Sequence, residues 1–176
     1  MGENCSVTAN GSYVGVLCGQ NNGGTITGCT NRGTARGNSC TGGLCGRNEG
    51  TMENCNNYGA ISSGSYAGGI CGRNEGAGIV DNCNNYGAVS GDAGREWAGG
   101  ICGSSSGILQ NSTNFGDIAG NYGVGGICGN NNTGTLSGCA NTGTVTAGSE
   151  GYAGGVCGIN SSEAFLANCY STGTVT

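Results

Sequence analysis

Thirteen cysteines in 176 residues are the most reactive side chains of this sequence, and most of them recur at regular intervals. Six are each followed by glycine and form a first series: Cys18, Cys45, Cys71, Cys102, Cys128 and Cys157. A second series lies 10 to 12 residues after the first and comprises Cys29, Cys55, Cys83, Cys139 and Cys169, with Ser112 in the fourth unit and Cys5 ahead of the first. Cys40 stands outside both series.

Three arrangements of these cysteines are open, because connectivity does not follow from sequence. Disulfides within each unit would join Cys18–Cys29, Cys45–Cys55, Cys71–Cys83, Cys128–Cys139 and Cys157–Cys169. Disulfides between units would join Cys5–Cys18, Cys29–Cys45, Cys55–Cys71, Cys83–Cys102 and Cys139–Cys157. In the third arrangement the cysteines are reduced and pack as small apolar side chains. A disulfide that closes a loop of about 15 residues adds about 3 kcal/mol of stability in the chain-entropy model.

The sequence contains few side chains suited to metal binding or to acid–base catalysis. The sequence has no histidine, no lysine and no Cys-x-x-Cys pair, which argues against a zinc site and leaves nothing to activate a thiol nucleophile. Glu49 and Glu75 hold equivalent positions in neighbouring units, so stacked units would bring them to about 5 Å. Arg47 and Arg73 precede them by two residues. We therefore expect an exposed Arg/Glu row, no catalytic residues and no cofactor.

The composition excludes several classes of protein. Forty-two glycines without proline rule out collagen, and a net charge of −5 with 9% charged residues is unlike most disordered chains. No basic patch is present for nucleic acid, and no apolar stretch is long enough to span a membrane. The sequence contains no secretory leader, and we expect that any leader has been removed.

An internal repeat organises the whole chain. Each unit has a polar residue three positions after its first cysteine: Asn21, Asn48, Asn74, Asn131 and Asn160, with Ser105 in the fourth unit. Two positions after the second cysteine come Asn31, Asn57, Asn85, Asn114 and Asn141, with Ser171 in the last unit. Two positions further, glycine fills every unit: Gly33, Gly59, Gly87, Gly116, Gly143 and Gly173. The units lie near 12–36, 37–64, 65–95, 96–120, 121–150 and 151–176, after a partial unit at 1–11, and form one domain.

This repeat predicts an all-β fold, a parallel β-solenoid of six coils of about 27 residues. Short apolar runs between glycines and asparagines indicate three strands per unit, in the third unit at 66–71, 79–83 and 86–89. Coils that stack about 4.8 Å apart would form a rod on the order of 29 Å long. We expect right-handed coils, from the usual preference for right-handed crossovers. The asparagines are expected to stack as amide ladders, and the glycines to serve positive φ angles or close backbone approach.

The repeat resembles the GLUG motif of bacterial cell-surface and adhesin-like proteins. Residues 66–76 (YAGGICGRNEG) and 81–89 (DNCNNYGAV) carry the resemblance, and 168–175 (NCYSTGTV) is the closest single segment. Where that motif commonly has a small aliphatic residue before the glycine, this chain has cysteine in all six units. The resemblance implies a secreted or surface-attached repeat region and implies no defined reaction.

Aromatic residues are the candidates for contact with a ligand. Tyr13, Tyr66, Trp97 and Tyr152 share one position in the repeat, where Cys40 replaces the ring in the second unit, and Tyr58, Tyr86 and Phe115 share another. Trp97 follows the longest insertion, at 90–96. We expect Trp97, Tyr66 and Tyr152 to contact a glycan or a protein of a host or neighbouring cell, unless these rings only stabilise the sheet.

Together these observations predict a non-catalytic extracellular or cell-surface module, a stalk or an adhesive surface. A first alternative is a filament subunit that associates end to end, since the chain ends at Thr176 without a polar cap. A distant alternative is a polysaccharide-active β-helix enzyme.

Overall fold

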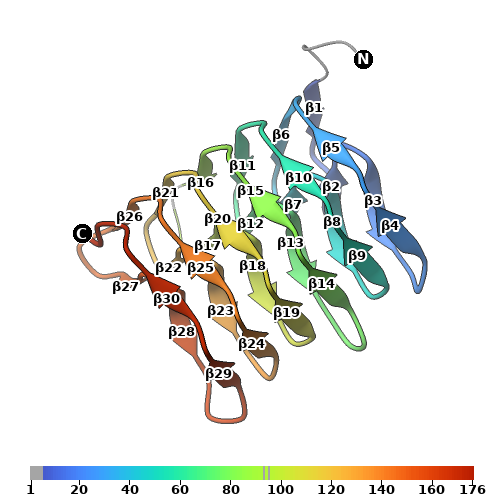
Figure 1. Cartoon of the computed structure of the whole chain (residues 1–176). Helices are drawn as coiled ribbons and strands as arrows, with labels where there is room; N and C mark the ends of the chain where they lie inside the picture. The colour runs from blue at the N-terminus through green and yellow to red at the C-terminus, as the bar shows by residue number, and fades with distance from the viewer. Residues whose placement is uncertain (1–5, 93, 95) are drawn as a thin grey trace.

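A computed structural model describes residues 6–92, 94 and 96–176, and this part of the chain contains thirty short strands and no helix. The strands form five sheets of six strands each. Neighbouring strands in every sheet are parallel, and each comes from a successive turn of the chain. Figure 1 shows the coils stacked side by side from the N-terminus to the C-terminus. The predicted all-β parallel solenoid of six coils is confirmed.

Within each sheet the strands follow the order of the chain from coil to coil. Sheet A contains β1 (Ser6–Ala9), β6 (Thr34–Gly37), β11 (Ile61–Ser63), β16 (Val89–Gly91), β21 (Ile118–Gly120) and β26 (Val145–Ala147). Sheet B contains β2 (Tyr13–Gly15), β7 (Cys40–Gly42), β12 (Tyr66–Gly68), β17 (Trp97–Gly99), β22 (Gly123–Gly125) and β27 (Tyr152–Gly154). Sheet C contains β3 (Cys18–Asn21), β8 (Cys45–Asn48), β13 (Cys71–Asn74), β18 (Cys102–Ser105), β23 (Cys128–Asn131) and β28 (Cys157–Asn160).

The remaining two sheets close each coil. Sheet D contains β4 (Thr25–Thr27), β9 (Thr51–Glu53), β14 (Ile79–Asp81), β19 (Ile108–Gln110), β24 (Thr135–Ser137) and β29 (Phe165–Ala167). Sheet E contains β5 (Thr30–Asn31), β10 (Asn56–Asn57), β15 (Asn84–Asn85), β20 (Thr113–Asn114), β25 (Ala140–Asn141) and β30 (Tyr170–Ser171). We number the coils from sheet B, so that coil one begins at β2 and coil six at β27, with β1 ahead of coil one.

The prediction of three strands per coil was wrong, because coils one to five have five strands each and coil six has four, β27 to β30. In coil three the expected strand at 66–71 is two strands, β12 and β13, which a bend at Gly69 and Ile70 separates. The expected strand at 79–83 ends at Asp81, because Asn82 has a φ of 48° and turns the chain. The expected strand at 86–89 begins only at Val89.

The coils are in strict register. Cys71 pairs with Cys45 of the preceding coil and with Cys102 of the following coil. The glycine that recurs in each coil serves this close stacking: a Cβ built on Gly59 would lie 1.7 Å from the carbonyl oxygen of Gly33. Real Cβ atoms never approach a backbone oxygen so closely, so this column accepts only glycine.

Left-handed backbone occurs at a different position, immediately before each second-series cysteine. Only asparagine and glycine fill it: Gly28, Asn54, Asn82, Asn111, Gly138 and Asn168, with φ between 48° and 63°. These two residue types tolerate positive φ most readily. The repeat therefore uses one column of glycines for close approach and a separate column of glycine and asparagine for the turn.

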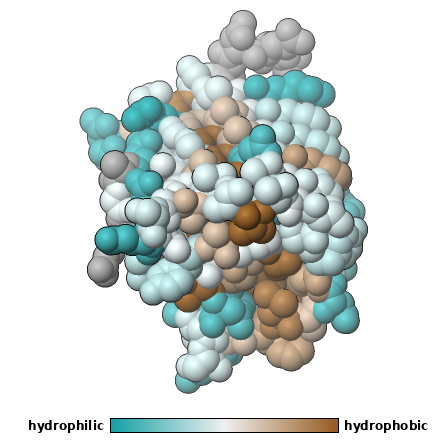
Figure 2. Space-filling view, turned by 90° about the vertical axis from the view of Figure 1, so that its left-hand side faces the viewer, coloured by the Kyte–Doolittle hydropathy of each residue, from teal (hydrophilic) through white to brown (hydrophobic). Residues whose placement is uncertain are grey.

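The core consists of columns of equivalent side chains. One cluster combines Leu44, Ile70, Ile101 and Ile127 with Met52, Val80, Leu109, Leu136 and the buried cysteines. A smaller cluster lies between sheets A and B, with Ile61, Val89, Ile118 and Val145 at its centre. Coil six, on the side of the molecule that faces the viewer in Figure 2, is the exception: Phe165 and Leu166 are 59% and 39% exposed, whereas Leu136 in coil five is buried.

Candidate functional site

An amide ladder runs through the inside of the solenoid at the end of sheet E. Each asparagine donates from Nδ2 to Oδ1 of the next, with distances of 2.7 Å for Asn31–Asn57 and 2.8 Å for Asn57–Asn85, Asn85–Asn114 and Asn114–Asn141. Each Nδ2 also donates to the carbonyl of the glycine two residues later, at 2.8 Å in the Asn85–Gly87 case. Asn141 closes the ladder by donating to Ser171 at 3.2 Å. These amides are buried and engaged with one another, so they are not available to a ligand.

A second amide ladder follows sheet C. Asn21 donates to Asn48 at 2.8 Å and Asn48 donates to Asn74 at 2.9 Å, but the contact from Asn74 to Ser105 is 3.5 Å long. The ladder resumes with Asn131 and Asn160 at 2.8 Å. Serine in coil four therefore interrupts a ladder that is otherwise continuous.

The twelve described cysteines are free thiols, and Cys5 lies outside the described residues. The structure therefore has the third of the three arrangements. First-series cysteines lie in register with each other from coil to coil, and the sulfurs of Cys71 and Cys102 are 3.5 Å apart. Ser112 takes the place of the missing second-series cysteine and accepts a hydrogen bond from the amide of Cys83 at 3.1 Å.

Burial keeps most of these thiols protonated. It raises the pKa of Cys45 and of Cys139 to about 12. The hydrogen bond with Cys102, followed by burial, raises the pKa of Cys71 well above its usual value. Between Cys55 and Cys83 the shared hydrogen bond lowers the pKa of Cys55 and raises that of Cys83, but both side chains are inaccessible to solvent. The columns are packing elements of the core.

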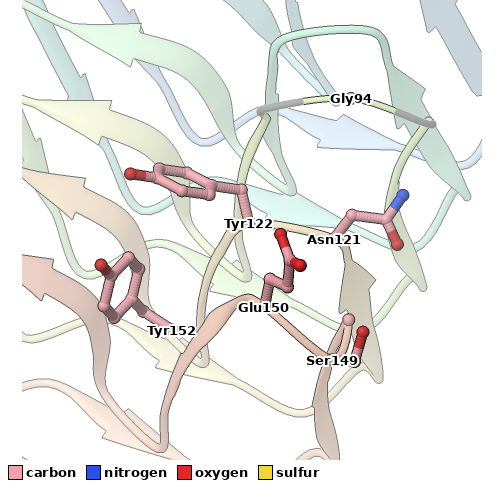
Figure 3. A pocket seen from close by; sticks show the side chains of 7 residues that line it. Gly94, Asn121, Tyr122, Ser149, Glu150 and Tyr152 are labelled. Atoms are coloured by element: carbon pink, nitrogen blue, oxygen red, sulfur yellow. The ribbon is translucent and has the colours of Figure 1, made fainter.

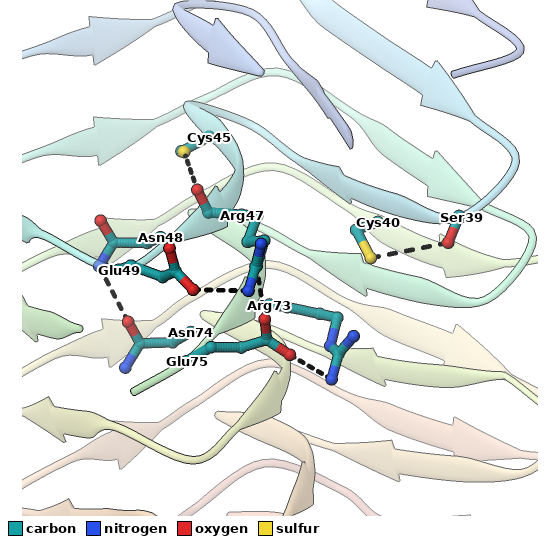
Figure 4. Close-up of polar contacts among 9 residues, drawn as sticks. All are labelled: Ser39, Cys40, Cys45, Arg47, Asn48, Glu49, Arg73, Asn74 and Glu75. Atoms are coloured by element: carbon teal, nitrogen blue, oxygen red, sulfur yellow. Dashed lines mark hydrogen bonds and ion pairs between the residues drawn. The ribbon is translucent and has the colours of Figure 1, made fainter. Parts of the chain in front are cut away.

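Glu49 and Glu75, the neighbouring carboxylates considered for acid–base catalysis, are held in ion pairs (Figure 4). Arg47 contacts Glu75 through Nε at 2.5 Å and Glu49 through a terminal nitrogen at 2.5 Å, and Arg73 also contacts Glu75. The hydrogen bond to Glu75 raises the pKa of Arg47. Arg47 and Arg73 lie over the rings of Tyr13 and Tyr66, at 5.5 and 4.9 Å from the ring centroids. The Arg/Glu row is thus a neutralised network.

In one aromatic row the rings stack face to face from coil to coil. Tyr58, Tyr86 and Phe115 stack with centroid distances of 4.6 and 4.7 Å and interplanar angles of 4° and 3°. The guanidinium of Arg32 covers the outer ring, at 4.7 Å from the centroid of Tyr58. Rings stacked in this way stabilise the sheet, and they present edges to solvent.

The other aromatic row begins in the same way and then changes geometry. Tyr66 and Trp97 stack at 5.0 Å and 12°, with Cys40 in register before Tyr66. Trp97 then meets Tyr122 edge to face at 5.9 Å and 87°, and Tyr122 meets Tyr152 edge to face at 5.5 Å and 85°. The structure therefore brings the three predicted contact residues into one row.

Tyr122 did not follow from the repeat, because it lies one residue before the aromatic position. Gly123 holds that position, in register with Trp97 and Tyr152. A Cβ on Gly123 would lie 2.7 Å from Cδ1 of Trp97, so the indole uses the space of the missing side chain. The order Tyr-Gly, at a position that holds an aromatic ring in four of the other five units, was the available signal.

Beside this row lies a hollow of about 410 Å³ (Figure 3). The side chains of Asn121, Tyr122, Ser149, Glu150 and Tyr152 line it, together with Gly94 and Gly148. Within the described residues, no cluster of three or more metal-ligating side chains occurs there or elsewhere. No helix that spans a membrane is found in the described residues.

The comparison with protein families found a match to one coil of the solenoid. Residues 37–62 match the GLUG motif. The match covers β7 to β10 and the start of β11, which is coil two. Its strands pair in register with those of coil three, so residues 66–76 and 81–89 lie at positions equivalent to those of the matched coil. No curated protein and no solved structure matched the chain.

Proposed function

We propose that this chain is a non-catalytic repeat module that acts outside the cell, as a stalk or adhesive surface of a bacterial surface protein. One observation carries the proposal: the polar side chains that recur in every coil are bonded to each other along the stack. Asn57, Asn85 and Asn114 bond in sequence inside the solenoid, and the Arg47–Glu75 network neutralises the repeated charges outside it. The repeat thus builds and rigidifies a rod, and any recognition falls to side chains that differ between coils.

The GLUG motif in coil two supports the extracellular part of the proposal, because the motif implies surface-attached proteins. The low content of charged residues and the in-register thiol columns are also compatible with a scaffold that presents a surface.

Labelling of intact cells tests this proposal. An epitope inserted at Gly11, which is exposed, would be detected with an antibody before and after permeabilisation of cells that produce the complete protein. We expect equal labelling in both states. Labelling that requires permeabilisation would overturn the extracellular assignment, and a cytoplasmic protein of the same cells serves as the control.

The stacking supports a second candidate, a filament subunit. Coils one to five repeat the same five strands in the same parallel register, so a coil of one copy has the geometry to pair with a coil of another. Light scattering across a range of concentrations separates the two candidates: a constant monomer mass contradicts the filament, and growth with concentration supports it.

A further inference from the structure

The hollow at Tyr122 results from the lengths of the connections between sheets A and B. In coils two and three this connection has two residues, 38–39 and 64–65. The connection at 121–122 is equally short, but it lies between the longer connections 92–96 and 148–151. A short connection between two long ones leaves a recess in the wall of a solenoid, and loops of unequal length are where repeat proteins commonly bind their ligands.

Hydrogen bonds fix the described backbone beside the recess, at Glu96, at 120–123 and at 148–151. Glu96 is fully buried, and its Oε1 accepts a hydrogen bond from the amide of Asn121. Gly123 donates to the carbonyl of Glu96 at 3.0 Å, and Gly148 donates to that of Gly120 at 2.9 Å. The amide of Gly151 donates back to Gly148 at 2.9 Å, which closes the longer connection into a turn. A site whose backbone is ordered before binding loses little entropy when a ligand arrives.

The side chains around the recess offer both hydrogen-bond donors and acceptors. The amide of Asn121, the hydroxyl of Ser149 and the carboxylate of Glu150 are exposed, and within the described residues they make no side-chain hydrogen bond or ion pair. An amide and a hydroxyl donate and accept, whereas a carboxylate only accepts. Tyr152, which is 54% exposed, adds an aromatic surface.

This combination selects a class of ligand. Among the described residues no cationic side chain lines the recess, and the net charge of −5 of the chain disfavours an anionic ligand. A purely apolar ligand would bury three polar groups without partners. A pyranose ring satisfies both demands, because its hydroxyls donate to a carboxylate and accept from an amide while its C–H face packs on an aromatic ring. A recess of about 410 Å³ is within the range of small-ligand sites.

We propose that this recess binds a neutral saccharide unit of a larger glycan, with Tyr152 as the aromatic platform and Glu150, Ser149 and Asn121 as hydroxyl ligands. The inference rests on the proposed function, since it gives the adhesive surface a location and a ligand class. It also separates this recess from the stacked row of Tyr58, Tyr86 and Phe115, whose rings pack on one another.

The chain carries its own reporter for the test. Trp97 is the single tryptophan, and its ring lies 5.9 Å from that of Tyr122. The purified chain would be screened on immobilised neutral, amino and acidic oligosaccharides, and soluble forms of those retained would be titrated by tryptophan fluorescence. We expect retention of one or more neutral hexose oligosaccharides and a saturable change in fluorescence.

Single-residue variants test whether the oligosaccharide binds in the recess. Tyr152→Ala is expected to weaken the affinity at least tenfold and Glu150→Gln several-fold, whereas Tyr58→Ala, which removes a comparably exposed ring from the stacked row, is expected to leave it unchanged. Circular dichroism and thermal unfolding of each variant report whether the fold persists. Retention of neutral glycans that is unaffected by both recess variants would overturn the inference and leave the proposed function standing. Retention of acidic or cationic oligosaccharides only, or of none, would also overturn it, while failure of the intact-cell labelling would instead overturn the proposed function.

Discussion

Ser105 lies in register beneath Asn131, and the Oδ1 atom of Asn131 is buried without a hydrogen-bond partner in the described part of the chain. In the other coils this oxygen accepts from the asparagine of the preceding coil, as Asn48 does from Asn21 at 2.8 Å. A serine hydroxyl is too short to make both contacts, so its bond from Asn74 is long and Asn131 receives none. A buried acceptor without a partner costs about 1–3 kcal/mol.

Ser105→Asn should therefore repair the ladder. We expect the free energy of unfolding to rise by about 1 kcal/mol, which raises the Tm by about 2–4 °C for a chain of this size. Urea and thermal unfolding measure the change. The control is Ser106→Asn, the same substitution one residue outside the ladder, which should have no such effect; equal effects would contradict the ladder as the cause.

Removal of an amide from the uninterrupted ladder should have the opposite effect. Asn85 accepts from Asn57 and donates to Asn114 and Gly87, so Asn85→Ala breaks three buried hydrogen bonds. We expect a loss of about 3 kcal/mol or more. Asn84→Ala is the matched control, because Asn84 is half-buried and makes one bond of 3.3 Å to Asn56. Similar losses for both variants would show that the inner ladder does not hold the coils together.

The glycine column gives a steric prediction. Gly59→Ala places a Cβ where the carbonyl of Gly33 already lies, so coils one and two would have to separate. We expect a loss above about 4 kcal/mol, or failure to fold. Gly11→Ala, which meets no atom within 4 Å, is expected to fold normally. Chemical unfolding of both variants checks the result, and a folded Gly59→Ala protein of native stability would rule out the close stacking.

The thiol columns predict a specific pH dependence. Because burial raises the pKa of Cys45 from 9 to about 12, the native state keeps a proton that the unfolded state has lost between these values. The contribution of this thiol is therefore complete below about pH 9 and falls toward pH 12, with a slope of up to about 1.4 kcal/mol per pH unit. Urea unfolding from pH 7 to 11 measures the slope. Cys45→Ser should reduce it, whereas an unchanged slope would contradict a buried neutral thiol.

Alkylation checks the oxidation state of the same columns. With a thiol reagent and no reductant, we expect the native protein to react at the partly exposed Cys18, Cys29, Cys157 and Cys169 of the outer coils and the unfolded protein at every described cysteine. Peptide mapping by mass spectrometry gives the positions. Cysteines that stay blocked after unfolding would show that disulfides form, and the blocked pairs would identify which.

The repeat carried enough information to predict the solenoid, because Cys71, Asn74, Asn85 and Gly87 recur at offsets that only stacked coils satisfy. The number of strands did not follow from the apolar pattern. Strand β15 consists of Asn84 and Asn85 alone and contains no apolar residue, so periodicity could not identify it.

The recess was harder to predict than the ladders. Its position depends on the relative lengths of three connections, 92–96, 121–122 and 148–151, which become neighbours only when the coils stack. Trp97 and Tyr152 were identified from their shared place in the repeat, but Tyr122 departs from that place by one residue. A residue that departs from the repeat, as Tyr122 does, is hidden when the units are aligned on their shared positions. In a repeat protein such residues are also where ligand recognition is expected.

We propose that this solenoid binds a saccharide at its surface and does not cleave it. The most direct test incubates the purified chain with the neutral oligosaccharide that it retains, and then measures both bound ligand and new reducing ends by mass spectrometry. We expect saturable binding that Tyr152→Ala weakens, with the oligosaccharide recovered unchanged. Release of shorter oligosaccharides that Glu75→Gln or Glu49→Gln abolishes would show that the solenoid cleaves its ligand and would identify the Arg/Glu row as catalytic.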